Sequence, residues 1–478
     1  MLHLWRQPRT LLIAAPFCLI FFYLFLYRSD SGFDVSRLPR PGSDPVLKNI
    51  TNTALEYVNT PIQAPYKDQF WETGQRSRRI VEWLEYIDKT AVNSEDRAAL
   101  LYAINEASSS LFSFVPRPDA NSRKPRLTAL RNLYDAGSRG IVMPVGGSDN
   151  NIRFAGHLIA SLREVLGCKL PIEIAYAGDD DLPKKAREAL ASLDSTGHIS
   201  FLNVWDVFDD ETLRLKEGGW AIKPFAALAS HFEQIILLDA DSVFLQNPET
   251  LFRQKPYTKT GAYMFHDRLL WQHGFGARHR WWHDQIKEPS AALDKSLVWT
   301  HDWSEECDSG VVVLDKSKIP VFVGLVHTAW QNTYDVREEV TYNLMYGDKE
   351  SWWLGMEYAG ADYEFEEHYG SILGWESTRT DDEVEKPAVC SFVIAHVDDE
   401  GRLIWYNGSL LKNKLKQPKT YEVPEAWMLD GTWKKGTTKG QMSCMVDAEI
   451  RKLDGEEHSI LERSIDVATR VDSLIEVT

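Results

Sequence analysis

Hydrophobic and polar positions in the middle of the chain predict strands and helices in turn. Short apolar runs at 141–145, 172–176, 199–204 and 235–238 have the length of buried strands. Apolar residues at helical spacing lie between these runs. Strand, helix and strand joined by short connections favour right-handed crossovers and a parallel sheet. The pattern therefore predicts an α/β fold with a mostly parallel central sheet.

Similar patterns flank this central part. Two apolar stripes between residues 67 and 114 predict two helices that pack on the sheet. Later apolar runs at 261–265, 311–314 and 391–396 predict further strands. The polar tail at 442–478 has sparse apolar positions at helix-like spacing, and the sequence assigns no function to it.

An uncharged apolar stretch occupies residues 10–27. It is near the minimum length for a membrane-spanning helix and longer than the apolar core of a typical signal peptide. No small-residue cleavage site is evident, so the stretch favours an uncleaved signal anchor, with most of the chain in the secretory lumen, over the alternative of a cleaved signal peptide. The residues that follow are rich in Ser, Asp, Pro, Asn and Thr with little periodicity, which predicts a stem.

These patterns divide the chain into five predicted segments. They are a cytoplasmic tail with the anchor (1–27), a stem (28–65), a helical segment packed on the α/β domain (66–135), the α/β domain itself (136–430) and a partly helical C-terminal extension (431–478).

Cysteines and glycosylation tripeptides agree with a luminal location. Outside the anchor, four cysteines permit two disulfides in three possible connectivities: Cys168, Cys307, Cys390 and Cys444. Their wide spacing contains no CxxC pair that would suggest zinc. The tripeptides that begin at Asn49 and Asn407 have the form of N-glycosylation acceptors, although such tripeptides also occur by chance.

The chain is acidic. Lys and Arg number 53 against 70 Asp and Glu, which gives a net charge of −17. This balance disfavours a nucleic-acid-binding surface. It also implies that any anionic substrate is bound through a local cation or a metal ion.

Two acids follow the apolar run at 235–238. Asp239 and Asp241 are expected at the carboxyl edge of the sheet, where open α/β sheets bind ligands. A hard divalent cation that holds a diphosphate needs oxygen ligands of this kind. The alternative is an Asp-Ala-Asp turn that caps its own backbone.

A glycine pair follows the first predicted strand. Gly146 and Gly147 stand where such a sheet would receive a nucleotide. The sequence contains no GxGxxG motif at this place, which disfavours a dinucleotide cofactor. The alternative interpretation of the glycine pair is an ordinary tight turn.

Other candidate residues lie near the ends of predicted elements. Lys223 is near the start of the helix that leads into the 235–238 strand, and its ordinary interpretation is a solvated surface lysine. Asp308 and Ser309 stand at the entrance of a later strand. His396 ends a late strand, where a histidine is usually structural, but a neutral imidazole also suits a metal held by two carboxylates.

The combination of these motifs resembles the GT-A class of nucleotide-sugar glycosyltransferases. The segment IILLDADSVFLQNPETLF looks like the Asp-Ala-Asp motif of glycogenin-like retaining transferases. Lys223 precedes Asp239 by sixteen residues, the offset of the lysine that reaches the donor in that class. The segment CDSGVVVLDK resembles their Asn-Ser-Gly strand motif, with Asp308 in place of Asn.

A closer resemblance is to the fungal Golgi α-mannosyltransferases of glycosyltransferase family 71. It extends over roughly Arg139 to Leu411 and rests on the order and spacing of RGIVMPVGGSDNNIRFAGHLIASLR, LPIEIAYAGDDDL, KPFAALASHFEQIILLDADSVFLQNPETLF, ECDSGVVVLDK, YGDKESWWLGME and IAHVDDEGRLIWYNGSLL. That family consists of type II membrane proteins that use GDP-mannose with Mn²⁺ and extend mannose chains on glycoproteins with retention. The sequence around ECDSGVVVLDK is more similar to the α-1,3-mannosyltransferase branch of that family than to its α-1,2 branch.

The resemblance implies a role for each candidate residue. These roles are binding of Mn²⁺ by Asp239, Asp241 and His396; donor binding by Lys223, Gly146 and Gly147; and orientation of the mannose by Asp308, Ser309, Asp348 and Glu350. Acceptor contacts are expected in the loops from His266 to Trp303 and around Trp352. The implied partners are the nucleotide-sugar donor, a glycan acceptor, the Golgi membrane and other Golgi transferases, with no nucleic acid.

Other functions use similar residues. An α-1,2-mannosyltransferase or another nucleotide-sugar-dependent transferase needs the same donor site. A glycosidase needs paired carboxylates, which Asp308 and Asp348 could supply, but it would not depend on GDP-mannose or manganese. A non-catalytic lectin-like subunit could keep the fold without the activity. The intact Asp239, Asp241 and Lys223 argue against such a subunit.

Overall fold

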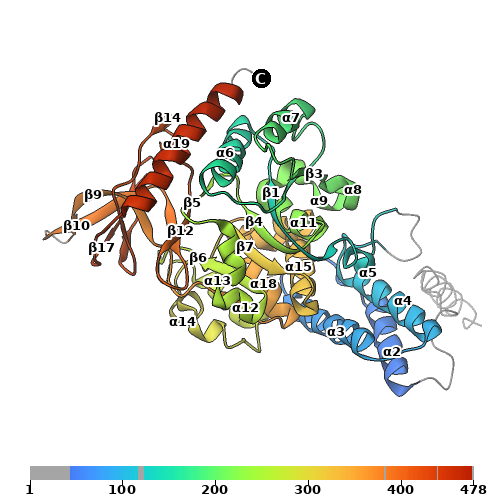
Figure 1. Cartoon of the computed structure of the whole chain (residues 1–478). Coiled ribbons are helices and arrows are strands. Elements are labelled where there is room, and N and C mark those ends of the chain that lie inside the picture. The colour runs from blue at the N-terminus through green and yellow to red at the C-terminus, as the bar shows by residue number, and fades with distance from the viewer. Residues whose placement is uncertain (1–43, 117–122, 382–383, 439, 476–478) are drawn as a thin grey trace, which may run out of the picture.

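Figure 1 shows the computed structural model of the chain, which describes residues 44–116, 123–381, 384–438 and 440–475. The predicted anchor at 10–27 lies outside these residues. Within the described ranges, no helix is both long enough and apolar enough to cross a membrane.

A seven-stranded sheet forms the centre of the molecule, in the order β3-β2-β1-β4-β7-β6-β8. Its strands are β1 (Asp135–Pro144), β2 (Ile172–Tyr176), β3 (Ile199–Asn203), β4 (Phe232–Leu238), β6 (Ala262–His266), β7 (Cys307–Asp315) and β8 (Glu364–Phe365). In this sheet β7 runs against the direction of the other strands. The predicted α/β fold with a mostly parallel sheet is therefore confirmed.

Strand β4 lies in the middle of the sheet, between β1 and β7. All four residues of its apolar run, Ile235–Leu238, are fully buried. Ile235 and Leu237 belong to one hydrophobic core and Ile236 and Leu238 to another, because side chains alternate between the two faces of a strand. The prediction of a strand buried on both faces is confirmed.

Helices cover both faces of the sheet (Figure 1). The core on one face includes residues of α11 (Ile222–Ala229), α15 (Ile319–Gln331) and α18 (Ser351–Ala359), and the core on the other includes residues of α6 (Asp149–Ala160). Further helices lie before and between the strands: α5 (Leu127–Leu130), α7 (Lys184–Ser192), α8 (Val204–Val207), α9 (Asp210–Leu213), α10 (Leu215–Gly218), α12 (Lys255–Thr260), α13 (Gly276–Gln285), α14 (Leu297–His301), α16 (Tyr334–Val336) and α17 (Tyr342–Leu344).

The two helices predicted before the sheet are present, as α3 (Phe70–Lys89) and α4 (Ser94–Leu111). A third helix, α2 (Pro45–Asn59), packs against α4 within the segment predicted to be a stem. Its Leu47, Ile50 and Ala54 are buried at helical spacing. The stem prediction is therefore wrong for α2, because the polar composition hid an apolar stripe.

A six-stranded antiparallel sheet lies beside the central one, in the order β16-β17-β10-β9-β15-β18. Its strands are β9 (Ile372–Asp381), β10 (Val384–Ser391), β15 (Ala426–Met428), β16 (Thr432–Lys434), β17 (Ser443–Val446) and β18 (Arg451–Lys452). The predicted boundary at residue 430 falls inside this sheet. Cys390 and Cys444 form a disulfide between β10 and β17, whereas Cys168 and Cys307 are buried thiols. The chain therefore forms one of the two disulfides that its cysteines permit.

Two small sheets and the last helix complete the fold. One sheet has the order β11-β12-β5, with β5 (Ser242–Phe244), β11 (Ile394–Val397) and β12 (Leu403–Asn407), and β13 (Leu411–Asn413) pairs with β14 (Gln417–Tyr421). The helix-like tail is confirmed only in its second part, as α19 (Gly455–Ile475), which packs on α6 (Figure 1), whereas β17 and β18 occupy its first part. Arg153 of α6 donates hydrogen bonds to the Asp472 carboxylate of α19, and the Arg153 Nε to Asp472 Oδ1 distance is 2.6 Å.

Candidate active site

A cleft of about 1280 Å³ opens at the carboxyl edge of the central sheet. Its walls come from the ends of β1 and β4, the start of α6, the turn before α11, and the hairpin between β13 and β14. Five of the predicted site residues line it together: Gly146, Gly147, Lys223, Asp239 and Asp241. The cleft therefore gathers residues that are separated by almost one hundred positions in the sequence.

The turn that carries the two aspartates is held by backbone hydrogen bonds from both sides. Asp239 N donates to Gly310 O of β7 at 2.8 Å, and Ser409 N donates to Asp241 O at 2.8 Å. Because β7 is antiparallel to β4, its first residues lie at the edge where β4 ends. This antiparallel pairing explains how an acid and a hydroxyl at a strand entrance come to lie beside Asp239.

Lys223 connects the predicted residues at this edge. Its Nζ lies 3.0 Å from Asp239 Oδ1 and 3.1 Å from Asp348 Oδ2, and it donates to Ser309 Oγ at 2.9 Å. The residue is only 3% exposed, so the interpretation as a solvated surface lysine is wrong. Burial lowers the pKa of Lys223, but the carboxylates of Asp239 and Asp348 outweigh it and hold the pKa above its usual value. Lys223 is therefore a buried, fixed positive charge.

The two aspartates of the turn are engaged by lysines from other elements. Burial raises the pKa of Asp239 to about 6, although the Lys223 ammonium opposes this shift. Asp241 forms an ion pair with Lys414, which stands on the hairpin between β13 and β14 and also lines the cleft. These contacts argue against a turn whose aspartates cap their own backbone. Both side chains stay partly open to the cleft, with 24% and 20% exposure.

The structure explains why glycine occupies both positions of the glycine pair. A Cβ atom at Gly146 would lie 2.3 Å from Asp181 Oδ2, and Gly147 has a φ of +73°, which L side chains rarely adopt. Asp181 in turn accepts a hydrogen bond from Ala177 N at 2.9 Å. The pair is thus a tight turn, and this turn forms one wall of the cleft.

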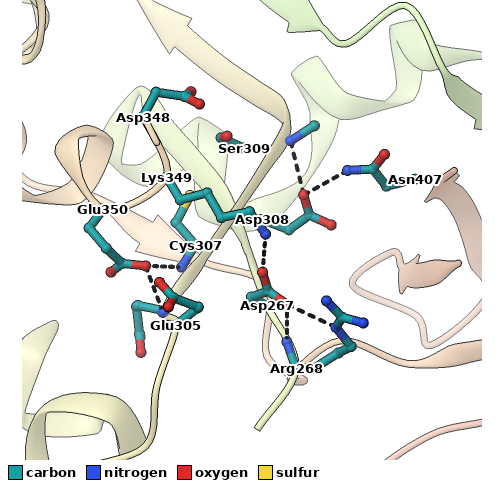
Figure 2. Close-up of polar contacts among 12 residues, drawn as sticks. Asp267, Arg268, Glu305, Cys307, Asp308, Ser309, Asp348, Lys349, Glu350 and Asn407 are labelled. Atoms are coloured by element: carbon teal, nitrogen blue, oxygen red, sulfur yellow. Dashed lines mark hydrogen bonds and ion pairs between the residues drawn. The ribbon is translucent and has the colours of Figure 1, made fainter. Parts of the chain in front are cut away.

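Asp308 lies beside the cleft but is sealed from it. Its Oδ1 accepts hydrogen bonds from Gly310 N at 3.1 Å and from Asn407 Nδ2 at 3.0 Å (Figure 2). Its Oδ2 faces His396 Nε2 at 3.3 Å, and the residue has no exposed surface. Burial acts to raise the pKa of Asp308, but Lys349 and His396 hold it well below its usual range. The prediction that Asp308 lines the sugar is wrong, because these protein partners surround its carboxylate.

His396 is enclosed in the same way. Its Nδ1 lies 2.6 Å from Glu366 Oε2, and its ring stacks on Trp405 with the centroids 4.3 Å apart. Burial alone would lower the pKa of His396, but Glu366 and Asp308 raise it to about 9. The ring is therefore an imidazolium at neutral pH, and both nitrogens have partners. The prediction of His396 as a third metal ligand is wrong.

The described residues contain no group of three or more His, Cys, Asp or Glu side chains arranged to hold a metal ion. Of the three predicted metal ligands, only Asp239 and Asp241 line the cleft. Magnesium-like ions are commonly bound by one or two carboxylates together with substrate phosphates. The donor set fits a cation that arrives with a diphosphate.

Glu350 and Trp352 are also structural. Glu350 is fully buried; its Oε1 accepts from Glu306 N at 3.0 Å and its Oε2 from Trp353 Nε1 at 2.5 Å. Burial raises the pKa of Glu350 well above its usual value. Trp352 is fully buried and donates to Asp348 Oδ2 at 2.8 Å. The predictions that Glu350 orients the sugar and that Trp352 contacts the acceptor are wrong.

The family of the chain follows from its sequence match. Residues 138–398 match the family model described as "Mannosyltransferase putative", and this range is more than half of the chain. The chain belongs to this mannosyltransferase family. The matched range begins within β1 and ends just after β11, so it includes most of β1 and all the other strands of the central sheet.

Relatives of this family member include named α-1,3-mannosyltransferases of Saccharomyces cerevisiae. The chain is 28% identical to alpha-1,3-mannosyltransferase MNT3 over 52% of its own length and 43% of that protein. It is 26% identical to alpha-1,3-mannosyltransferase MNT2 over 59% of its own length and 53% of that protein. The chain thus spans about half the length of the curated relatives that it matches.

Solved structures align with this mannosyltransferase-family chain at low similarity. The galactosyltransferase LgtC in complex with donor and acceptor sugar analogues is 14% identical over 48% of this chain and 73% of that one, with a TM-score of 0.30. The Saccharomyces cerevisiae mannosyltransferase Ktr4p is 9% identical over 65% and 81%, also with a TM-score of 0.30. TM-scores this low do not establish a shared fold.

Sequence reasoning missed several polar residues of the family member's site. Lys349 pairs with Asp267, which also contacts Arg268 Nε at 3.2 Å (Figure 2). The strand rule could have found Asp267, because it directly follows β6, which ends at the same edge as β4. Lys414 and Glu366 stand in segments without a motif.

Asn407 was also missed as a site residue, because its sequence suggested only a glycosylation tripeptide. It ends β12, pairs with Ser242 of β5, and donates its side-chain amide to the buried Asp308 carboxylate. In the folded mannosyltransferase-family chain, Asn407 is therefore a structural residue.

Proposed function

We propose that the chain transfers mannose from GDP-mannose to mannose-containing glycans of glycoproteins, forming α-1,3 linkages with retention of configuration. The observation that carries this proposal is the cleft that brings Asp239, Asp241 and Lys223 together in a member of a mannosyltransferase family. The relatives named α-1,3-mannosyltransferases support the linkage. The family-71 resemblance supports the donor and the stereochemistry.

A divalent cation, with Mn²⁺ first among the candidates, fits the cleft. Asp239 and Asp241 would hold it, because both carboxylates face the cleft and carboxylate oxygens suit a hard cation. When bound, such an ion stabilises the negative charge that develops on the leaving diphosphate. In this proposal the chain has a GT-A-type donor site, in which the nucleotide-sugar and the metal ion bind side by side at the carboxyl edge of the central sheet.

The chain's own residues carry the remaining tasks. The Lys223 ammonium adds a fixed positive charge beside the diphosphate, where preorganised charge is most effective. Asp348 holds the other side of that ammonium and is itself held by Trp352, so it orients the lysine. Gly147 lets the donor approach the backbone at the first strand end, and Gly146 makes room there for the Asp181 carboxylate. The sealed Asp308 is not a candidate for the nucleophile of a double-displacement mechanism.

The proposal extends to the Golgi membrane. The uncharged stretch at 10–27 would anchor the chain as a single-pass type II protein, and the disulfide between Cys390 and Cys444 supports an oxidising lumen. Protease protection of the folded domain in sealed microsomes would test this orientation. Digestion of the domain without detergent would contradict it.

The decisive experiment supplies several donors in parallel. The full chain, purified in detergent, is incubated with Mn²⁺, α-mannobiose and either GDP-mannose or UDP-sugars, and the product linkage is determined by NMR. We expect a trisaccharide with a new α-1,3 bond from GDP-mannose and its loss after chelation of the metal. A product with an α-1,2 bond would correct the linkage. Hydrolysis of the mannobiose without a nucleotide donor would identify a glycosidase, and no consumption of any donor would identify a non-catalytic subunit.

A further inference from the structure

Two large aromatic side chains stand in solvent at the mouth of the cleft. Trp220 is 51% exposed and Tyr346 is 59% exposed, and their ring centroids lie 5.7 Å apart. Trp220 is also one of the residues that line the cleft. Aromatic rings that remain in water beside a cleft form the kind of apolar patch that marks a ligand contact.

The position of the Trp220 ring is built into the backbone. Gly347 has a φ of +65°, and a Cβ atom there would lie 2.8 Å from Trp220 Cε3. The ring can lie against the chain at this point because residue 347 has no side chain. On the other side, the buried Arg337 donates to Leu213 O at 2.5 Å and to Arg214 O at 2.9 Å, which fixes the segment that leads to Trp220.

The same two segments carry charged residues of the site. Trp220 precedes Lys223 by one helical turn, and Tyr346 precedes Asp348 by two residues. Lys223 Nζ and Asp348 Oδ2, 3.1 Å apart, join these segments beneath the rings. The aromatic pair is therefore held at a fixed place relative to the reacting end of the cleft.

The ion pair between Lys223 and Asp348 and the glycine wall belong to different strand ends. Gly146 and Gly147 follow β1, whereas Asp348 meets Lys223 together with Ser309 of β7. Strands β1 and β7 flank β4 on opposite sides. A donor held by the glycine wall and by Asp239 leaves the aromatic pair for a second ligand.

We propose that Trp220 and Tyr346 form the platform on which the terminal mannose of the acceptor stacks. A hexopyranose presents C–H groups on one face, and this face packs on an aromatic ring while its hydroxyl groups stay available to water. This assignment rests on the proposed function, and it replaces the buried Trp352 as the acceptor contact. Binding without a nucleotide tests it separately from catalysis.

The test measures binding of α-mannobiose and, in parallel, lactose to the full chain by saturation-transfer NMR without donor. We expect Trp220→Ala and Tyr346→Ala each to weaken the α-mannobiose Kd by about tenfold. Trp220→Phe is expected to keep most of the affinity, because it keeps a ring. The GDP affinity of Trp220→Ala, measured with Mn²⁺, is expected to stay within about twofold of the wild type.

Val384→Ala is the control, since Val384 is an apolar residue of β10 that is 58% exposed and does not line the cleft. It should change neither affinity. The platform is overturned if Trp220→Ala binds α-mannobiose like the wild type, if it loses GDP affinity to the same degree, or if the wild type binds neither sugar. Binding of lactose alone, with dependence on Trp220, would support the platform and contradict the proposed mannose specificity.

Discussion

Two groups of carboxylates lie at the same edge of the central sheet, and they differ in what surrounds them. The open pair, Asp239 and Asp241, faces the cleft, and each carboxylate has a lysine partner. The sealed cluster, Asp308 with His396 and Glu366, has essentially no exposed side-chain surface. Its polar atoms are bonded to one another and to Asn407.

The difference shows what makes a carboxylate available for chemistry. In the sealed cluster, protein donors occupy the carboxylate oxygens, so the buried charges are satisfied and stabilise the fold. In the open pair, a lysine contacts one side of each carboxylate, and the other side faces a cleft that a ligand can enter. The two groups therefore predict different losses when they are changed, in activity for the open pair and in stability for the sealed cluster.

The largest effect is expected from Asp239→Asn. This variant should lower kcat for mannose transfer by about a thousandfold, because it removes charge where the donor diphosphate and its cation bind. Its melting midpoint should move by less than about 3 °C, since Lys223 keeps Asp348 as a partner. Transfer of radiolabelled mannose and a thermal melt measure the two quantities.

Asp430→Asn is the matched control for this variant, because its carboxylate is 61% exposed and pairs with His368 away from the cleft. It should leave both quantities unchanged. Wild-type transfer by Asp239→Asn would remove the open pair from the site.

Asp308→Asn sharpens the comparison from the other side. Removing this buried charge leaves the His396 imidazolium and Lys349 with less compensation, so we expect a loss of about 3 kcal/mol in the free energy of unfolding. Denaturant titration measures it. The GDP affinity of the folded fraction should stay within about threefold of the wild type. A variant that folds as stably as the wild type but cannot bind GDP would place Asp308 in the site.

His396→Gln should change how stability depends on pH. The pKa of His396 is about 9 in the folded chain and about 6.5 when unfolded, so its stabilising contribution is complete below pH 6.5. The contribution is lost as pH rises through 9, and it amounts to about 3 kcal/mol. The unfolding free energies of wild type and variant should therefore differ by about 3 kcal/mol at pH 6 and approach each other at pH 9.5. A constant difference across that range would contradict a charged His396.

The smallest effect is expected from Lys414→Ala. Lys414 is 40% exposed, so its ion pair with Asp241 is worth at most about 1 kcal/mol. Without this competitor, Mn²⁺ alone should bind about threefold more tightly in a calorimetric titration without nucleotide. Weaker Mn²⁺ binding would show that Lys414 does not compete with the cation for Asp241.

The sequence predicted the frame of the site because local periodicity determines it. Four buried aliphatic residues identified β4, and the strand-end rule located Asp239 and Asp241 at the carboxyl edge. The same rule could not tell the open pair from the sealed cluster, because strand ends specify an edge and not the partners of each side chain. Lys414 follows Asp241 by 173 residues on a short hairpin, and no local pattern connects the two.

Amino-acid composition led to a wrong prediction for the stem and for the tryptophans around Trp352. The stem prediction followed the polar residues of 45–59, although Leu47, Ile50 and Ala54 form a buried stripe. The tryptophans around Trp352 suggested a sugar contact, but their depth in the core depends on how α15 and α18 pack, which is a tertiary property. Trp220 had no distinguishing sequence signal, since its exposure follows from Gly347 and Arg337.

The contact between α19 and α6 restricts how the protein can be shortened for crystallography. A fragment that stops at residue 430 would lose β17, the disulfide partner of Cys390, and the helix that covers Ala160 with Val467 and Val471. Such a fragment would expose apolar surface at the end of α6 and leave an unmatched thiol, both of which promote aggregation during expression. A useful boundary therefore lies after α19, and a useful start lies before α2.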